Sequence, residues 1–452
     1  MRPKVFRTRL ALAGILIFLL GPADTAGAET PRRTVMGNGI ILLVQEAPSI
    51  PMVTVQVIVR AGSRRDFPGK AGLANLTAAL LDEGTRTRTS GQIADALDFM
   101  GARFSVRAGS DYAEISLQVL EKDLEAGLEI LSEMMILPAF PETELDRIRK
   151  EVKGGLIAEE DQPGTVAEKE FNRIIFGSHP YHLPVEGTVE TIDAISQADI
   201  KTFHDRFYRP NNTILAMVGD ISNKKAEKIV RRFFRKWTPG KVPEDPVPPI
   251  EDLKHPVTRL IDKDLTQANI VLGHPGINRS NPDYYAVSVM NYILGGGGFS
   301  SRLMKNIRDE RGLVYGIFSY FDALEDRGSF SVAFQTQNSQ AQTAIDEIMR
   351  ELRAIRSQPV TPVELEEAKA FLMGSFPLRF DTTSKIANFL AQVEFHGLGL
   401  DYLERYPGLI QEVGINDIQR VAQKYIDPGR MGLVVVARQE EAKIGGAKGS
   451  PE

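Results

Sequence analysis

The chain contains 452 residues, of which 42% are hydrophobic and 25% are charged, and it carries a formal net charge of −5 at pH 7. That length exceeds what one hydrophobic core usually organises, so two or more domains are expected. The acidic balance gives no support for nucleic-acid binding. The absence of cysteine excludes disulfides, thiolate metal sites and a cysteine nucleophile. Any metal site would have to use histidine and carboxylate ligands.

The N-terminal segment has the pattern of a secretory signal. Four basic residues precede an apolar run over residues 10–20, and the small residues Ala26-Gly27-Ala28 follow. The apolar run is shorter than the ~20 residues that span a bilayer, so no membrane anchor is expected after cleavage. We expect residues 1–28 to be removed and the chain to be exported, to the periplasm if the source is a two-membrane bacterium.

Hydrophobic periodicity predicts an α+β domain over residues 29–237. Runs of β-branched residues predict strands, and a period near 3.6 predicts helices. The predicted strands are Thr34–Val44, Met52–Ala61, Arg103–Ala108, Tyr112–Val119 and Thr213–Val218. The predicted helices are Gly69–Leu81, Ser90–Met100, Glu121–Met135, Pro141–Ala158 and Gln197–Phe207.

A proline-rich segment over residues 238–256 cannot continue a helix or a central strand, and it predicts a semi-rigid linker. The following half, residues 257–440, repeats the order of strands and helices, which predicts two homologous domains. Its expected strands and helices are Val257–Ile261, Ala268–Gly273, Tyr284–Leu294, Ser301–Arg308, Tyr315–Phe321, Ser329–Gln335 and Met431–Val436. Residues 441–452 are expected to be a disordered tail.

The string Gly72-Leu73-Ala74 leading to Gly84-Thr85, within this layout, resembles the GLAHxxEHxxxxGT motif of the insulinase/pitrilysin zinc peptidases. In active members two histidines four residues apart on one helix bind zinc, and the intervening glutamate is the general base. The resemblance implies two homologous domains, each an antiparallel-rich sheet covered by helices, that form half of a clam-like peptidase chamber.

The residues at the motif's functional positions cannot bind zinc. Asn75 stands at the first histidine position, Ala78 at the glutamate and Ala79 at the second histidine. The family's third ligand, a glutamate on a later helix, aligns with Gly155, or with Gly154 if the alignment slips by one residue. The resemblance therefore implies a degenerate zinc motif and no metal or other cofactor in this chain.

A second motif is better preserved. The run Gly295–Gly298 and the string from Phe299 to Tyr315 resemble the family's glycine-rich turn and its arginine/tyrosine motif, with Arg308 and Tyr315 seven residues apart. We expect Gly312 to end the helix that bears Arg308, so that both side chains converge. A guanidinium and a phenol can both donate hydrogen bonds to a peptide carbonyl oxygen, but neither supplies a nucleophile. The glycine run lacks the Gly-Lys-Ser/Thr of a phosphate loop and predicts a turn with positive φ.

The histidines do not form a replacement zinc site in the sequence. His179 and His182 lie in a segment rich in proline and glycine that predicts a loop, and we expect them to be structural. The remaining histidines are scattered singly, at His204, His255, His274 and His396.

The leading hypothesis is a non-zinc-binding subunit of a heterodimer, in which Arg308 and Tyr315 act in trans to a homologous partner that holds the zinc and hydrolyses unfolded peptides. One alternative is a structural or binding subunit without peptidase activity. Another is an independent zinc peptidase with relocated ligands, which would need a cluster of ligands that the sequence does not show.

Overall fold

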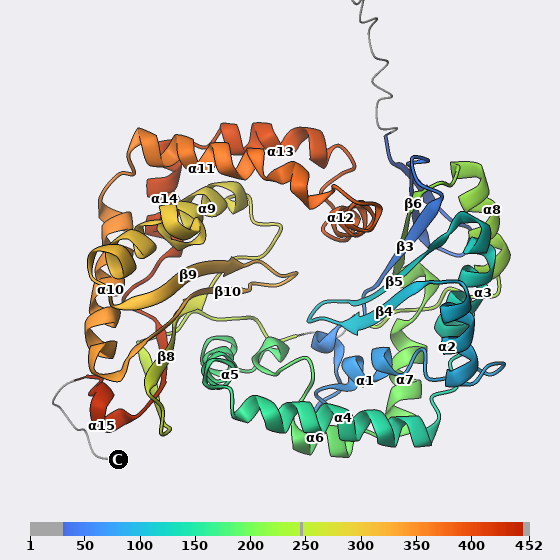
Figure 1. Cartoon of the computed structure of the whole chain (residues 1–452), viewed down its shortest axis with the longest axis horizontal. Helices are drawn as coiled ribbons and strands as arrows, with labels where there is room; N and C mark the ends of the chain where they lie inside the picture. The colour runs from blue at the N-terminus through green and yellow to red at the C-terminus, as the bar shows by residue number, and fades with distance from the viewer. Residues whose placement is uncertain (1–29, 245–246, 446–452) are drawn as a thin grey trace, which may run out of the picture.

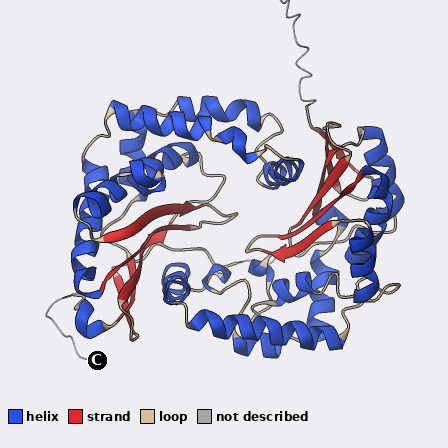
Figure 2. Cartoon of the chain, in the orientation of Figure 1, coloured by secondary structure: helices blue, strands red, loops and turns tan. Residues whose placement is uncertain are grey.

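The computed structural model describes residues 30–244 and 247–445, and the predicted signal peptide lies outside them. The chain forms two mixed sheets with helices over their outer faces (Figure 2). The strands of the first sheet are β1 (Arg32–Val35), β2 (Ile41–Glu46), β3 (Met52–Val59), β4 (Arg103–Ala108), β5 (Ala113–Leu120) and β6 (Thr213–Gly219). In the sheet they lie in the order β1-β2-β6-β3-β5-β4. The strands of the second sheet are β7 (Val257–Asp262), β8 (Gln267–Pro275), β9 (Val314–Asp322), β10 (Ser329–Gln337) and β11 (Gly432–Ala437). In the sheet they lie in the order β7-β11-β8-β10-β9.

The helices follow the strands in two corresponding sets. Those of the first half are α1 (Leu73–Ala79), α2 (Ser90–Phe99), α3 (Leu124–Ile136), α4 (Glu142–Glu160), α5 (Pro163–Phe176), α6 (Val189–Ala194), α7 (Gln197–Phe207) and α8 (Asn223–Phe234). Those of the second half are α9 (Tyr284–Asn291), α10 (Ala341–Ser357), α11 (Pro362–Gly374), α12 (Thr383–Phe395), α13 (Tyr402–Gln411), α14 (Ile415–Tyr425) and α15 (Gln439–Ala442). Among the described residues no helix is long and apolar enough to cross a membrane.

The sheets confirm the predicted α+β class and its internal repeat. In each sheet one pair of strands is parallel, β2 with β6 and β7 with β11, and the remaining pairs are antiparallel. Segment 238–256 forms neither helix nor strand in its described residues. The first two residues of the predicted tail, Glu441 and Ala442, belong to α15, and residues 446–452 lie outside the description.

Two predicted elements differ from the structure for local reasons. The predicted strand Thr34–Val44 is a hairpin, because the chain turns at residues 37–39, where Gly39 has φ +94°. The helix predicted from Gly69 begins only at Leu73, since Gly72 has φ +95° and cannot belong to an α-helix.

Each half contributes one helix to the sheet of the other half (Figure 1). Helix α5 packs on β8 and β11, where Phe171 and Ile175 meet the valines of the second sheet, including Val434. Helix α12 packs on β3 and β6, where Leu390 and Phe395 meet apolar side chains of the first sheet. Burying each large apolar side chain contributes roughly 1.5–3 kcal/mol, so this exchange stabilises the two halves as one unit.

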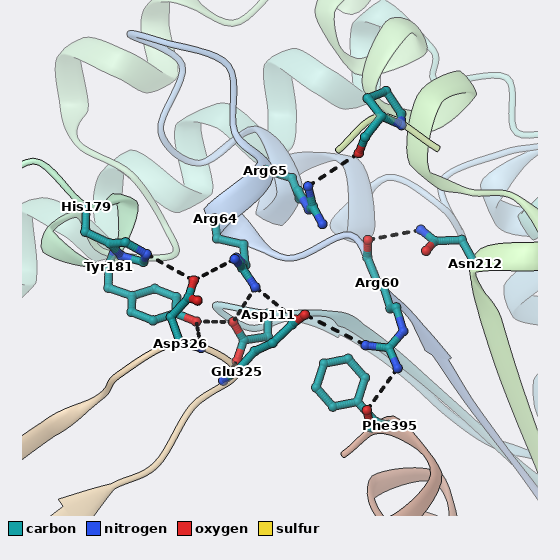
Figure 3. Close-up of polar contacts among 11 residues, drawn as sticks. Arg60, Arg64, Arg65, Asp111, His179, Tyr181, Asn212, Glu325, Asp326 and Phe395 are labelled. Carbon is teal, nitrogen blue, oxygen red and sulfur yellow. Dashed lines mark hydrogen bonds and ion pairs between the residues drawn. The ribbon is translucent and has the colours of Figure 1, made fainter. Parts of the chain in front are cut away.

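A polar cluster, here called the clasp, joins the halves at a second place (Figure 3). Arg64, in the short 3₁₀ helix η1 (Ser63–Arg65), bonds Glu325 at 2.9 Å and Asp326 at 2.6 Å, both in the turn between β9 and β10. The buried Asp111 accepts hydrogen bonds from the Tyr181 hydroxyl and, at 2.9 Å, from the Glu325 amide. The clasp therefore fixes the tip of the β9–β10 hairpin against the first half.

His179 completes the clasp from the side of the loop after α5. Its Nε2 lies 3.2 Å from Asp326, and its Nδ1 accepts the Tyr181 amide at 3.2 Å, which corresponds to a neutral ring. Burial lowers the pKa of His179, because the ring is almost inaccessible to solvent. This supports the structural role that the sequence predicted for this histidine.

Replacing Arg64 tests whether the clasp holds the halves together. We expect Arg64→Met to lower the free energy of unfolding by about 2 kcal/mol, because it leaves the buried Asp111 carboxylate without its cation. The expected cost is below that of a fully buried pair, since Glu325 and Asp326 remain 38% and 36% exposed. Urea unfolding followed by circular dichroism measures the change.

Arg65→Met is the matched control, since the neighbouring Arg65 forms no ion pair with a described residue: its guanidinium donates to the Pro243 carbonyl at 3.5 Å and lies 5.9 Å from the centre of the Phe207 ring. Equal unfolding midpoints for the two variants would show that the clasp does not stabilise the fold.

Candidate functional site

Helix α1, which carries the predicted degenerate zinc motif, is capped at its start by Asp66. The Asp66 carboxylate accepts the amides of Gly72 at 2.8 Å and Ala74 at 2.7 Å, and so satisfies free N–H groups at the start of α1. Burial raises the pKa of Asp66 to about 8, against the opposing effect of these backbone donors. Asp66 therefore fixes the start of the helix that carries Asn75, Ala78 and Ala79.

Asn75 and Ala79 lie four residues apart on α1 and are half-buried, whereas Ala78 is fully buried. Gly155 is exposed on α4, which contacts α1, and a Cβ built there would meet nothing within 4 Å. Gly154 is equally open. No group of three or more His, Cys, Asp or Glu side chains that could hold a metal ion occurs within residues 30–244 and 247–445. The donor set at these positions does not fit zinc.

His182 does not replace the missing ligands. It ends the 3₁₀ helix η3 (Pro180–His182), and its Nδ1 bonds the backbone carbonyl of His179 at 2.7 Å. His179 itself bonds Asp326, so the rings of His179 and His182 form hydrogen bonds within the clasp and the loop.

The structure brings Arg308 and Tyr315 together at the start of β9, which we call the Arg–Tyr corner. Arg308 lies in the wide-turned helical segment η7 (Met304–Glu310), which ends before Gly312 with φ +62°. Its Nε donates to the backbone carbonyl of Tyr315 at 2.9 Å, and its guanidinium carbon lies 5.8 Å from the Tyr315 ring. The sequence prediction that Gly312 allows this convergence agrees with the geometry.

A β-bulge sets the direction of the Tyr315 side chain. Val314 pairs with Thr336 and Ile317 with Phe334, so two residues of β9, Tyr315 and Gly316, stand opposite one residue of β10. Such a bulge changes the direction of the side chain it carries. Without it, Tyr315 would share the buried face of Ile317; with it, the side chain is 90% exposed.

Phe299 is a third member of the corner that sequence reasoning did not single out. Its ring is 69% exposed and lies 5.0 Å from the guanidinium carbon of Arg308, within cation–π range. The signal that could have identified it is a large aromatic residue directly after four glycines. Phe299 belongs to the 3₁₀ turn η6 (Gly298–Ser300), which presents it beside Arg308.

Two features of the structure require glycine within the run Gly295–Gly298. Gly298 has φ +58°, as the sequence predicted for a turn. Gly295 has negative φ, and a Cβ there would come within 2.5 Å of the Ser319 hydroxyl, so a close approach to β9 requires this glycine. The run therefore allows the segment before Phe299 to pack tightly on the strand that carries Tyr315.

The Arg–Tyr corner offers hydrogen-bond donors, but Arg308 and Tyr315 do not supply a general base. In the part of the chain that the structure describes, Arg308 Nη1 bonds Asp309 at 2.8 Å, while neither Arg308 Nη2 nor the Tyr315 hydroxyl has a hydrogen-bond partner. Arginine stays protonated at all accessible pH values and cannot remove a proton. The arrangement can bind a carbonyl oxygen and stabilise negative charge on it.

Comparison with known proteins agrees with the fold. Residues 41–189 match the family described as insulinase (peptidase family M16), and residues 194–372 match the peptidase M16 inactive domain. An uncharacterized zinc protease of Streptomyces coelicolor is 29% identical over 373 residues, 81% of each chain. A non-peptidase homolog of Helicobacter pylori is 24% identical and covers 89% of this chain and 93% of its own.

Among solved structures, a peptidase M16 inactive domain from Pseudomonas fluorescens is 30% identical, with a TM-score of 0.85, over 90% of this chain and 98% of its own. A protease from Helicobacter pylori shares the fold at 22% identity, with a TM-score of 0.83 over 90% of this chain and 99% of its own. The sequence matches cover both halves, and the structural match covers nearly the whole described chain. The chain belongs to the insulinase family of peptidases, family M16.

Proposed function

We propose that this chain is the non-zinc-binding subunit of a heteromeric metallopeptidase and that it supplies Arg308 and Tyr315 in trans to a homologous, zinc-bearing partner. The observation that carries the proposal is the contrast between the two sites. The positions of the zinc motif hold no ligand, whereas Arg308 and Tyr315 present exposed hydrogen-bond donors at a corner formed by a bulge and a positive-φ glycine.

In this proposal an unfolded peptide is bound between the two subunits. Zinc in the partner supplies an activated water molecule for attack on the peptide carbonyl. Arg308 Nη2 and the Tyr315 hydroxyl of this chain donate hydrogen bonds to the carbonyl oxygen as negative charge develops on it. Phe299 restricts the position of the guanidinium through its ring.

The expected cellular setting follows from the sequence. We propose that residues 1–28 act as a signal peptide and that the chain is exported, to the periplasm in a two-membrane bacterium. The chain itself is expected to carry no cofactor.

A second candidate function is a structural or peptide-binding subunit without any part in hydrolysis. The similarity to the protein named a non-peptidase homolog favours it. The two candidates differ in one measurable respect, which is whether peptide hydrolysis by a complex of this chain and its partner depends on Arg308.

Mixing the two purified subunits tests the shared site. Hydrolysis of an unfolded fluorogenic peptide should require this chain together with a homologous exported chain that has an intact His-x-x-Glu-His motif, and a chelator should abolish it. Arg308→Ala should lower kcat by about 10²-fold or more, the usual effect of removing one such donor. Arg311→Ala is the matched control, because Arg311 directly follows the same helical segment and bonds Glu347 at 3.0 Å.

Full activity of the partner alone, or an Arg308→Ala complex as active as the Arg311→Ala complex, would contradict the shared site and leave the structural role.

Metal analysis tests the absence of a zinc site in this chain. We expect the purified protein to contain far less than equimolar zinc by mass spectrometry. The variant Asn75→His/Ala79→His/Gly155→Glu should gain nearly equimolar zinc, because the first two positions lie on one helical face and the third has open space. Equimolar zinc in the unmodified chain would overturn the assignment and support relocated ligands.

A further inference from the structure

A pocket of about 600 Å³ lies between α5 and the inner face of the second sheet, directly beside the Arg–Tyr corner. Its wall on one side is α5, through Phe171 and Asn172, and its floor is β8 and β10. Tyr315 and Gly316, the two residues of the β-bulge, also line it. The volume is in the range of small-ligand sites.

The pocket exists because the middle of the sheet carries small side chains. On β10, Ser329, Ser331 and Ala333 alternate toward the pocket, and on β9 Gly316 leaves a gap whose nearest neighbour is the Phe318 ring at 3.7 Å. Larger residues at these positions would fill the space between the sheet and α5. The floor is therefore a shallow apolar surface with hydroxyl groups along it.

Aromatic rings form the remaining wall. Phe318 and Tyr320 alternate along β9 on the pocket side, with ring centroids 6.3 Å apart, and they are 40% and 54% exposed. Exposed apolar rings that gather at a concave surface favour an interaction partner with apolar groups. The rings thus extend the apolar surface of the pocket from Tyr315 along the strand.

The charge of the lining narrows the choice of ligand. Glu168, at the exposed edge of α5, is the single charged side chain of the pocket among the described residues, and it forms no ion pair with another described residue. Asn269 on the floor is already bonded to Gln335 at 2.8 Å. The pocket accordingly suits an uncharged apolar group, and the carboxylate at its rim disfavours an acidic one.

Pairing of a peptide backbone with the edge strand β9 is restricted at two positions. The Ser319 carbonyl accepts from the Asn291 amide at 3.0 Å, and the Tyr315 carbonyl accepts from Arg308 at 2.9 Å. Two backbone acceptors of this strand are therefore already used by side chains. The pocket beside the strand offers a further place for recognition, through a side chain that enters it.

We propose that the pocket between α5 and β8–β10 binds a large apolar or aromatic side chain of the peptide whose carbonyl is held at the Arg–Tyr corner. The proposal rests on the proposed function for the identity of the occupant, because Tyr315 belongs to both the corner and the pocket. It adds a substrate class: unfolded peptides with a bulky uncharged residue close to the cleaved bond.

Binding to the complete mature chain without its partner tests the pocket alone. The probes are fluorescein-labelled peptides of equal length that differ at one central position, Phe, Ser or Glu, and fluorescence anisotropy gives their affinities. The Phe peptide should bind at least about tenfold more tightly than the Ser peptide, the effect of burying one aromatic side chain, and the Glu peptide most weakly. Equal affinities for the Phe and Ser peptides would overturn the proposal.

Two variants act on the pocket in opposite ways. Ser331→Trp fills it, and Phe318→Ala/Tyr320→Ala removes its aromatic wall from an exposed surface that the fold can spare. Each should reduce the Phe-to-Ser affinity ratio to near one. Ser105→Trp is the matched control, since Ser105 is an exposed position of β4 at the edge of the first sheet, and it should keep the ratio.

Glu168→Gln should improve binding of the Glu peptide severalfold and leave the Phe-to-Ser ratio unchanged. A preserved ratio in both the Ser331→Trp and the double variant would refute the pocket assignment.

The experiments can distinguish a failure of the pocket proposal from a failure of the proposed function. A Phe preference that depends on the pocket, combined with hydrolysis that is insensitive to Arg308→Ala, would keep the pocket as a peptide-binding site and reject the shared catalytic site. Equal affinities for the Phe and Ser peptides, combined with hydrolysis that depends on Arg308, would keep the shared catalytic site and reject the pocket.

Discussion

The exchange of α5 and α12 between the two halves is the constraint on which the rest of the structure depends. A sheet with one covered face and one bare apolar face is not stable by itself, and each half covers part of its inner face with a helix of the other. Val434 and Val436 are fully buried only because α5 lies over them, and Ile58 and Ala216 only because α12 does. The two sheets therefore cannot separate without exposing apolar surface on both.

This coupling explains how a corner in the second half can be held in a fixed position relative to the first half. The β9–β10 hairpin carries Tyr315 at one end and the acidic turn at the other. Arg64 holds that turn, and the pocket beside Tyr315 has α5 of the first half as its wall. The residues that would contact a peptide are thus positioned by both halves, and loosening the clasp would change the pocket as well as stability.

The sequence was sufficient for the elements whose pattern is local. The strand over Arg103–Ala108 has the predicted bounds, and Arg308 and Tyr315 meet as predicted, because Gly312 and the spacing of seven determine a short connection. The turn at residues 37–39 is also a local feature, because Asn38-Gly39 is a residue pair that favours a hairpin, and the single strand predicted over Thr34–Val44 did not take it into account.

The rest of the site depends on contacts between distant parts of the chain. Helix α5 (Pro163–Phe176) was not among the predicted helices, and the surface that it packs against, on β8 and β11, is far away in the sequence. The bulge at Tyr315 and Gly316 depends on the register between β9 and β10, and periodicity along β9 alone places Tyr315 on the buried face. Neither the pocket nor the exposure of Tyr315 could follow from sequence periodicity.

The Arg–Tyr corner and the positions of the zinc motif differ in how much their side chains contribute to the fold. Alanine at positions 78 and 79 fits a buried helix without any polar group to satisfy, so a helix without zinc ligands is compatible with a stable fold. Phe299 and Tyr315, by contrast, leave most of their rings in solvent, and the bulge omits a regular strand pairing. Exposed rings and an omitted strand pairing add little to the stability of the described chain. This is the pattern expected of residues whose contacts lie on another molecule.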